Sequence, residues 1–326
     1  EAGYATAAFV GAFVVDARFG LDRGFEVYDF QVGRTGYRPN QADFNERSAS
    51  EVTDATLAWL DDRPRDRPFF VWMHYFDPHL PYTSPLATWP ALKNRPYDAE
   101  IAFADQQLGR LIAWLEQRGL AERTIVVVTA DHGEALGEHG ELTHGMFIYD
   151  ATMRVPLVIW SPSLLPGPLR LEDRAVGLVD LRGTIEDLVG VGAAPDLDGL
   201  SLLGEIPADR QVYLETEGPL RTVGCSPLRG LRSTADKYID APDREYYDLA
   251  ADPGETDNLY HEHRRDLAGR QETIDAILAT DRPETGGREI TDEEKTRLRS
   301  LGYTVVDRDP EDRTLPDPKR MIGPFN

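Results

Sequence analysis

An acidic and an imidazole side chain stand next to each other in the run Thr129–Gly133, which reads T-A-D-H-G. The run follows the apolar stretch TIVVVT, so we expect Asp131 and His132 to leave a buried strand at its end. There both side chains can turn toward one cation. The carboxylate of Asp131 suits Ca²⁺ or Mg²⁺, and the nitrogen of His132 widens the choice to Mn²⁺ or Zn²⁺. The alternative is a solvated loop that turns at Gly133.

The elements that must position these two residues alternate between strands and helices. Apolar runs predict strands at 6–10, 69–75, 124–129 and 155–160, and helical periodicity predicts helices over 43–61, 101–115 and 180–191. Buried strands that alternate with helices predict an α/β sandwich around a mainly parallel sheet. Ligands of such sheets bind at the carboxyl ends of the strands, so the loops after Tyr75 and Thr129 are the expected site.

From about residue 207 the pattern changes to short alternating segments, which predict a small antiparallel sheet. These segments are 211–215, 228–232, 237–239 and 245–249, and a polar helix is expected at about 262–279. Beyond residue 280 the chain is rich in proline and charge, with one short helical stretch near 292–301. We therefore predict a core over 1–205, a C-terminal subdomain over 206–280 and a weakly packed tail over 281–326.

The composition limits the partners. The 326 residues carry a formal net charge of −22, which argues against a nucleic-acid or anionic-membrane partner but leaves room for a small anionic substrate in a local pocket. No apolar run approaches the roughly 18–20 residues that cross a bilayer, so no membrane contact is evident. The single cysteine excludes an internal disulfide framework.

The longer motifs carry a family resemblance. The run T-I-V-V-V-T-A-D-H-G-E-A-L-G-E-H-G, followed by T-H-G-x-F-x-Y-D-x-x-x-R-V-P, resembles the C-terminal half of the sulfatase catalytic domain, in the alkaline phosphatase-like superfamily. Four further stretches resemble bacterial sulfatase-like hydrolases in the same order: G-Y-A-T-A-A-F-V-G-A-F, E-V-T-D-A-T-L-A-W-L, F-F-V-W-M-H-Y-F-D-P-H-L-P-Y and Y-Y-D-L-A-A-D-P-G-E-T-D-N-L. The resemblance implies an alkaline phosphatase-like sandwich with a small C-terminal antiparallel sheet. It also implies metal-dependent hydrolysis of sulfate esters.

The resemblance carries residue roles with it. Asp131 and His132 fall where family members supply two ligands to one divalent metal, which makes Ca²⁺ the first choice, although many sulfatases have Asn in place of His132. His79, in D-P-H-x-P-Y, falls where the family has a histidine that contacts the sulfate or the leaving-group oxygen. His144 falls where many relatives carry a sulfate-binding lysine. A histidine there keeps a donor but makes its charge depend on pH.

Other parts of the family pattern do not match this chain. The family needs two further acidic ligands and a nucleophile, formylglycine in sulfatases, and all of these normally precede the first matching segment. We therefore expect an N-terminally truncated piece that is inactive alone, with formylglycine and any export signal or membrane anchor in the missing segment. Cys225 stands in C-S-P-L-R, which resembles the formylglycine signature. It lies in the predicted C-terminal subdomain, so we interpret the match as chance and Cys225 as a packed side chain.

Two other functions remain open. One is a phosphonate monoester or phosphodiester hydrolase, or a phosphoethanolamine-type transferase, of the same superfamily, since an Asp-His pair is compatible with that chemistry. The other is a non-catalytic fragment or pseudoenzyme, which the absent ligands suggest. The nucleophile distinguishes the first from a sulfatase, because phosphoryl-transferring relatives use Thr or Ser. The partner expected in each catalytic case is a small anionic ester.

Overall fold

The computed structural model of this chain describes residues 2–30, 47–165, 167–168, 170–171, 173–192, 197–280, 291 and 314–325. The contacts divide the chain into two units. One is Glu1–Thr124 with Ser161–Ser163, and the other is Ile125–Trp160 with Leu164–Asn326. The sequence predicts domain boundaries after residues 205 and 280, where its pattern changes. The division by contacts does not test these boundaries, so they stay predictions. The helical stretch expected at 292–301 lies outside the described residues.

The first unit contains a parallel three-stranded sheet. β1 (Ala5–Val10) lies between β2 (Val27–Asp29) and β3 (Phe69–His74), in the order β2-β1-β3. Ala5 pairs with Phe69 and Val10 pairs with His74, so β1 and β3 are in register along their whole length. The predicted strands at 6–10 and 69–75 are therefore confirmed, and the parallel direction agrees with the predicted fold class.

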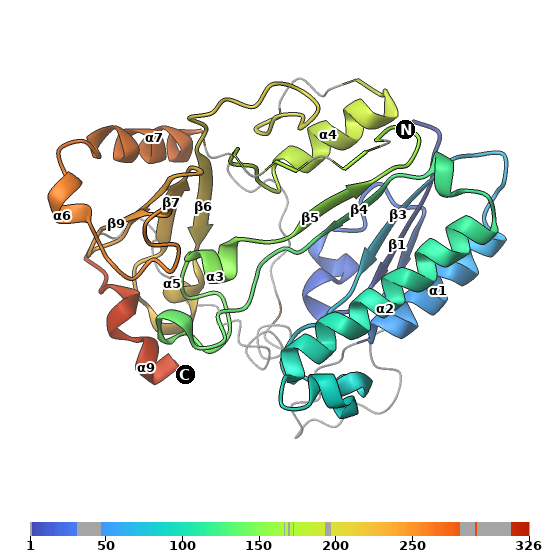
Figure 1. The fold of residues 1–326 in the computed structure, drawn as a ribbon, viewed down its shortest axis with the longest axis horizontal. Coiled ribbons are helices and arrows are strands. Elements are labelled where there is room, and N and C mark those ends of the chain that lie inside the picture. Colours follow the sequence, from blue (N-terminus) through green and yellow to red (C-terminus); the bar gives the residue numbers. More distant parts are fainter. Residues whose placement is uncertain are drawn as a thin grey trace. The chain divides into compact units, whose positions relative to one another are not determined.

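Two α-helices belong to the same unit as this sheet. α1 (Ala49–Asp62) begins with a capping box in which the Ser48 hydroxyl accepts from the N–H of Glu51, and the Glu51 carboxylate accepts from the N–H of Ser48. Val52 of α1 packs against Phe9 of β1, as the helical spacing requires. α2 (Pro96–Gln117) lies beside α1 (Figure 1). Both predicted helices are confirmed, and residues 43–46 of the first lie outside the described part.

The second unit begins with a two-stranded sheet. β4 (Val126–Thr129) and β5 (Leu157–Trp160) confirm the predicted strands but pair antiparallel, with Val126 opposite Trp160. Apolar runs predict a strand without its direction, which the intervening loop decides. The short helix α3 (Asp150–Met153) precedes β5, and α4 (Asp180–Val189) follows it as predicted.

The C-terminal part of this unit is a four-stranded antiparallel sheet in the order β6-β7-β8-β9. Its strands are β6 (Val212–Thr216), β7 (Leu228–Arg232), β8 (Asp236–Asp240) and β9 (Glu245–Asp248), and α5 (Gly218–Val223) connects β6 to β7. The sheet confirms the predicted antiparallel arrangement. The polar helix expected at 262–279 is interrupted, because α6 (Tyr260–His263) and α7 (Ala268–Ala279) are separate.

Alternate residues of each strand point to opposite faces of this sheet, and both faces are covered. Leu231 and Tyr238 pack against Ile274 of α7 on one face. Leu228 and Ile239 pack against the buried segment 146–149 on the other face. The sheet therefore contacts the end of the loop that carries the T-H-G motif.

Residues 314–325 also pack on this sheet, although the sequence indicates a weakly packed tail. The N–H of Ser226 donates to the carbonyl of Pro316 at 2.9 Å, and the N–H of Asp243 donates to the Asp317 carboxylate at 3.0 Å. This segment ends in α9 (Ile322–Phe325). Short 3-10 helices complete the described elements, at Phe13–Val15, Ala17–Phe19, Pro85–Thr88, Pro90–Leu92, Ala121–Arg123, Glu138–Gly140 and Pro318–Arg320.

Candidate functional site

The Asp-His pair lies directly after β4, as predicted. The Asp131 carboxylate accepts a hydrogen bond from the N–H of His132 at 3.0 Å, and 79% of its side chain is exposed. Its other oxygen, Oδ2, lies 3.7 Å from Nε2 of His132. Nδ1 of His132 is 2.9 Å from the carbonyl oxygen of Gly133. Because that contact favours a proton on Nδ1, the lone pair of Nε2 faces the Asp131 carboxylate.

Gly133 holds this pair against the backbone of α3. Its N–H donates to the carbonyl of Thr152 at 2.6 Å, and a Cβ at this position would lie only 2.4 Å from the carbonyl oxygen of Ala151. The glycine is therefore required by close packing of two backbone segments. The glycine of the D-H-G motif is thus explained by packing, whatever the role of Asp131 and His132.

The loop after Gly133 folds back on itself and brings His144 to the pair. The N–H of Ala135 donates to the carbonyl of Thr143 at 2.8 Å, so Glu134 and His144 stand opposite each other across the loop. Nδ1 of His144 is 3.0 Å from Oε1 of Glu134, whose side chain is only 3% exposed. The ring of His144 stacks on that of His132, with centroids 3.9 Å apart. Asp131, His132 and His144 therefore form one cluster, which we call the histidine cluster.

The histidine cluster fits two ligands of a divalent metal. Two ligands of one cation at bond lengths of about 2.0–2.5 Å are separated by roughly 3–3.5 Å, close to the spacing of Oδ2 in Asp131 and Nε2 in His132. The contact of His132 with Gly133 is the kind that orients metal-binding histidines. Among the residues that the structure describes, no group of three or more His, Cys, Asp or Glu side chains could hold a metal. The fit is therefore that of a partial ligand set.

His79 lies in the first unit, five residues after the end of β3. Its Nδ1 is 2.7 Å from the carbonyl oxygen of Leu80, and its ring stacks on Phe76 with centroids 4.2 Å apart. The loop position expected for His79 is thus found. The structure brings Asp131, His132 and His144 together in the second unit, whereas His79 belongs to the first unit.

A half-buried and a buried carboxyl group, those of Asp77 and Glu100, lie beside the loop of His79, and the sequence did not single them out. Asp77 accepts a hydrogen bond from the N–H of Ala49 at 2.8 Å and pairs with Glu100 of α2. Glu100 is 3% exposed. Burial and the negative charge of Asp77 raise the pKa of Glu100 to about 7. Burial likewise raises the pKa of Asp77. Two acidic residues 23 positions apart carry no sequence signal for such a pair.

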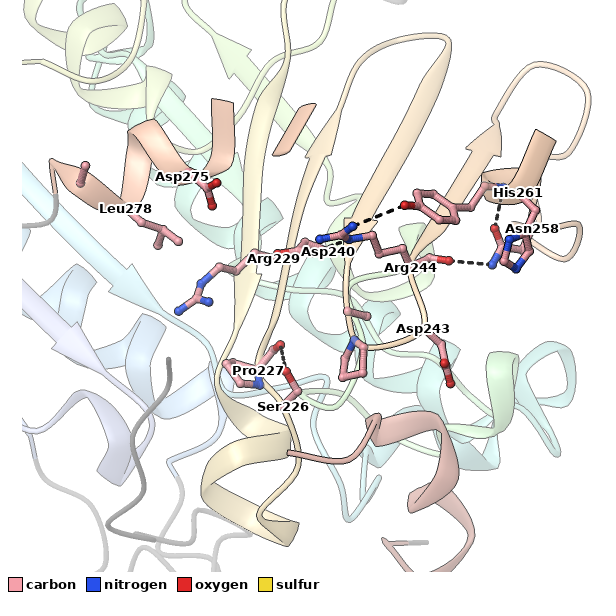
Figure 2. Close-up of a pocket in the computed structure, with 14 residues that line it drawn as sticks. Ser226, Pro227, Arg229, Asp240, Asp243, Arg244, Asn258, His261, Asp275 and Leu278 are labelled. Carbon is pink, nitrogen blue, oxygen red and sulfur yellow. Dashed lines mark hydrogen bonds and ion pairs between the residues drawn. The ribbon is translucent and has the colours of Figure 1, made fainter. Parts of the chain in front are cut away.

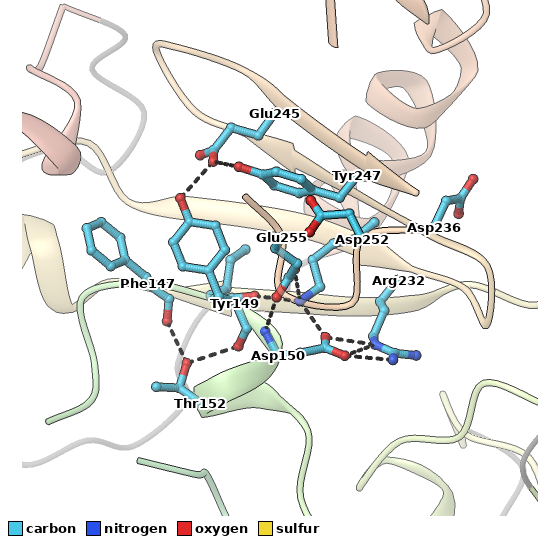
Figure 3. Close-up of polar contacts among 12 residues, drawn as sticks. Phe147, Tyr149, Asp150, Thr152, Arg232, Asp236, Glu245, Tyr247, Asp252 and Glu255 are labelled. Carbon is cyan, nitrogen blue, oxygen red and sulfur yellow. Dashed lines mark hydrogen bonds and ion pairs between the residues drawn. The ribbon is translucent and has the colours of Figure 1, made fainter. Parts of the chain in front are cut away.

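A buried ionic network joins α3 to the C-terminal sheet (Figure 3). Nζ of Lys237, a fully buried side chain, lies 2.6 Å from a carboxylate oxygen of Asp150 and 2.6 Å from one of Glu255. Arg232 contacts the same Asp150 through Nε at 2.9 Å. Burial raises the pKa of Asp150, but the hydrogen bonds from Arg232 and Lys237 outweigh it and lower this pKa to about 2. Lys237 and Glu255 stand in the K-Y-I and D-P-G-E runs, which are the signals that could have identified them.

Cys225 is fully buried, and in the sequence it lies after the end of α5 and before the start of β7. Its N–H donates to the carbonyl of Pro219 at 3.1 Å, as expected where a helix ends at a glycine, here Gly224 with a φ of 69°. It is a packed side chain, as predicted, although it precedes the strand instead of lying in it. A buried side chain at this position is unsuited to attack an external substrate.

A polar cavity of about 750 Å³ lies beside the β8–β9 turn and contains none of the predicted site residues (Figure 2). Three of its charged groups, Asp240, Asp243 and Arg244, are in ion pairs. Nε of Arg244 donates to Asp240 at 3.1 Å, and Arg320 contacts Asp243 at 2.9 Å.

None of the described helices is long and apolar enough to cross a membrane.

Comparisons with known proteins agree with the motifs. The family model described as "Sulfatase" matches residues 1–191. Arylsulfatase K of Bos taurus is 33% identical over a segment that covers 50% of this chain and 32% of that protein. N-acetylglucosamine-6-O-sulfatase of Bacteroides thetaiotaomicron is 31% identical, over 56% of this chain and 34% of that protein. The matched segment thus spans about a third of the length of these curated relatives.

Solved structures show the fold. A protein solved with its substrate D-glucosamine-2-N,6-O-disulfate has a TM-score of 0.61 at 19% identity, covering 95% of this chain and 82% of the other. The phosphonate monoester hydrolase of Agrobacterium radiobacter has a TM-score of 0.64 at 20% identity, with the same coverages of 95% and 82%. The predicted alkaline phosphatase-like fold is therefore confirmed. Because both sulfate- and phosphonate-type names occur at similar scores, fold likeness does not choose between the two chemistries.

Proposed function

The chain belongs to the sulfatase family, and on that premise we propose that it serves the metal-dependent hydrolysis of sulfate esters. The observation that carries this proposal is the histidine cluster. By the motif resemblance, Asp131 and His132 correspond to two family metal ligands and His144 to a sulfate-binding residue, and their proximity in the structure supports this assignment. The substrate that suits this arrangement is a small anionic ester.

Asp131 and His132 are the residues that would hold the metal. The family generally uses a divalent metal, and we propose Ca²⁺ ahead of Mg²⁺, Mn²⁺ and Zn²⁺, with the imidazole of His132 as the reason to test the softer ions. When bound, the metal supplies positive charge that offsets the negative charge developing on the ester. The contact between His132 and Gly133 keeps the ligating nitrogen turned toward Asp131.

His144 and His79 would contact the substrate. Glu134 holds Nδ1 of His144, which leaves the opposite nitrogen on the far side of the ring from the buried carboxylate. A histidine so held can donate a hydrogen bond to a sulfate oxygen. We assign His79 to the sulfate or the leaving-group oxygen, where it can give a proton. Cys225 is not proposed as the nucleophile because it is buried. We also propose that the protein is exported.

The test compares two ester chemistries. The protein is purified as its native host makes it, and its turnover of 4-methylumbelliferyl sulfate and of bis(4-nitrophenyl) phosphate is measured with and without EDTA. We expect EDTA-sensitive turnover of the sulfate, and a loss of at least about 100-fold in Asp131→Asn, because a metal ligand is removed. The matched control is Asp209→Asn, which removes an exposed carboxylate in the same unit.

The outcomes separate the alternatives. Preferred turnover of the phosphodiester would overturn the sulfatase proposal in favour of a phosphoryl-transferring relative. Absence of turnover of either ester would favour a pseudoenzyme. Calcium binding can be followed separately by calorimetry, where Asp131→Asn and His132→Ala should both weaken the affinity while Asp209→Asn should not.

A further inference from the structure

The carbonyl group of Gly145, the residue after His144, is held by the C-terminal sheet. The hydroxyl of Thr216, the last residue of β6, donates to this carbonyl at 2.7 Å. The same hydroxyl accepts a hydrogen bond from the N–H of Gly218 at 3.0 Å. Because the acceptor side of the hydroxyl is engaged by Gly218, its proton is directed at Gly145.

The backbone after β6 also presses against this carbonyl. A Cβ on Gly218 would lie 2.0 Å from the carbonyl oxygen of Gly145 and 2.9 Å from its carbon, well inside any tolerable contact. Only glycine allows this approach. Thr216 and Gly218 together therefore define where the backbone beside His144 can lie.

A second anchor lies a few residues further along the same loop. Nζ of Lys237 donates to the carbonyl of Ile148 at 3.1 Å and pairs with Asp150 at 2.6 Å. Its side chain is 0% exposed. A buried ammonium group needs such partners, so this contact is maintained in the folded protein. The loop from His144 to Asp150 is thus fixed to the sheet at both ends.

From these contacts we infer that Thr216 is a positioning residue for His144. Glu134 orients the imidazole ring, and the hydroxyl of Thr216 fixes the backbone from which that ring extends. The C-terminal sheet then takes part in building the site and is more than a separate structural module. The effect on turnover rests on the proposed function, whereas the effect on the position of His144 does not.

The test reads the environment of His144 directly. Histidine labelled with ¹³C at Cε1 is incorporated, and the His144 signal is assigned as the one lost in His144→Gln. At one fixed pH, we expect this signal to shift in Thr216→Val, which replaces the hydroxyl with a methyl group, and to stay at the wild-type position in Thr216→Ser. Thr273→Val is the matched control, because its hydroxyl donates to the Gly269 carbonyl at 2.9 Å on the exposed face of α7.

Turnover of 4-methylumbelliferyl sulfate is measured on the same variants. Thr216→Val should lower kcat by about 10- to 100-fold, since a small displacement of a substrate-contacting group has that effect, and Thr216→Ser should restore most of it. If Thr216→Val does not fold, Gly218→Ala displaces the same carbonyl from the other side and should shift the same signal.

An unmoved His144 signal in a folded Thr216→Val or Gly218→Ala variant would overturn the inference. Equal shifts in Thr273→Val would do the same, because the effect would then not be specific to Gly145. A shifted signal in a protein that turns over no sulfate ester would support the positioning role and count against the proposed function instead.

Discussion

The rings of His132 and His144 stack with centroids 3.9 Å apart and planes inclined by 28°. One of these residues is the proposed metal ligand and the other the proposed substrate contact. Their stacking means that neither ring can move far without displacing the other. Groups that hold one ring therefore act on both, and Glu134 is the buried group that holds His144.

Replacing Glu134 with glutamine should lower the turnover of a sulfate ester. Glu134→Gln keeps the shape of the side chain but removes the negative charge beside Nδ1 of His144, so the ring is held less firmly. We expect kcat/KM for 4-methylumbelliferyl sulfate to fall by about 10- to 100-fold, the usual effect of removing a residue that orients a functional histidine. Glu138→Gln, an exposed change on the same loop, is the control and should retain activity. Equal activity in the two variants would contradict the role of Glu134.

Glu100 should make stability decrease with rising pH. Its pKa is raised from 4.5 to about 7 by burial and by Asp77, so the folded protein keeps this proton after the unfolded chain has lost it. The free energy of unfolding should therefore fall between about pH 4.5 and pH 7 and level off above. Glu100→Gln cannot titrate and still offers a donor to Asp77.

Urea unfolding at pH 5 and pH 8 checks this expectation. Glu100→Gln should match the wild type at pH 5 and be more stable at pH 8, by roughly 1–3 kcal/mol. Glu116→Gln, an exposed change on α2, serves as the control and should follow the wild type at both values. A Glu100→Gln variant that is less stable than the wild type at pH 8 would count against the shared proton.

Removing the buried charge of Lys237 should destabilise the second unit. Lys237→Met removes the cation that Asp150 and Glu255 share; Arg232 still pairs with Asp150, but Glu255 keeps a buried carboxylate without that cation, which typically costs about 3–5 kcal/mol. Arg221→Met is the comparison, because Arg221 of α5 pairs with Glu217, four residues away, while their side chains are 53% and 37% exposed, and its loss should cost about 1 kcal/mol or less. Thermal unfolding followed by circular dichroism measures both. If the two variants lose the same stability, the burial of Lys237 does not make its ion pairs more important for stability than an exposed pair.

The thiol of Cys225 should not react with thiol reagents in the folded protein. Its side chain is 0% exposed, so 5,5′-dithiobis(2-nitrobenzoate) should release no colour until urea is added, and then one equivalent per chain. Cys225→Ser should also retain full turnover of the sulfate ester. Rapid labelling of the native protein, or loss of turnover in Cys225→Ser, would reopen the C-S-P-L-R motif as a functional site.

The regular elements could be predicted because burial imposes a period on the sequence. Val52 and Trp59 repeat at helical spacing since one face of α1 packs on β1, and the run before Asp131 is apolar because it forms β4. The Asp-His pair was visible because its two members are adjacent. Even so, the direction of pairing between β4 and β5 depends on the loop path, which periodicity does not report.

The supports of the histidine cluster could not be predicted in the same way. Thr216 contacts a residue 71 positions away and Lys237 one that is 89 positions away. A threonine at a strand end and a lysine on a strand are ordinary residues until the fold brings a carbonyl to them. Glu134 is closer in sequence to His144, but their contact requires the loop to double back, and Gly137 and Gly140 indicate a turn without fixing which residues then face each other.

The four residues of α3 have a consequence for how this protein opens. A helix of one turn has no independent stability in water, so α3 persists through the bond from the N–H of Asp150 to Glu255 at 2.5 Å and through the ion pair of Asp150 with Lys237. Its amide protons should therefore exchange with solvent only when the C-terminal sheet itself opens. Gly133, beside the histidine cluster, is hydrogen-bonded to α3. We therefore expect the histidine cluster to unfold together with the C-terminal sheet, although that sheet is far from it in the sequence.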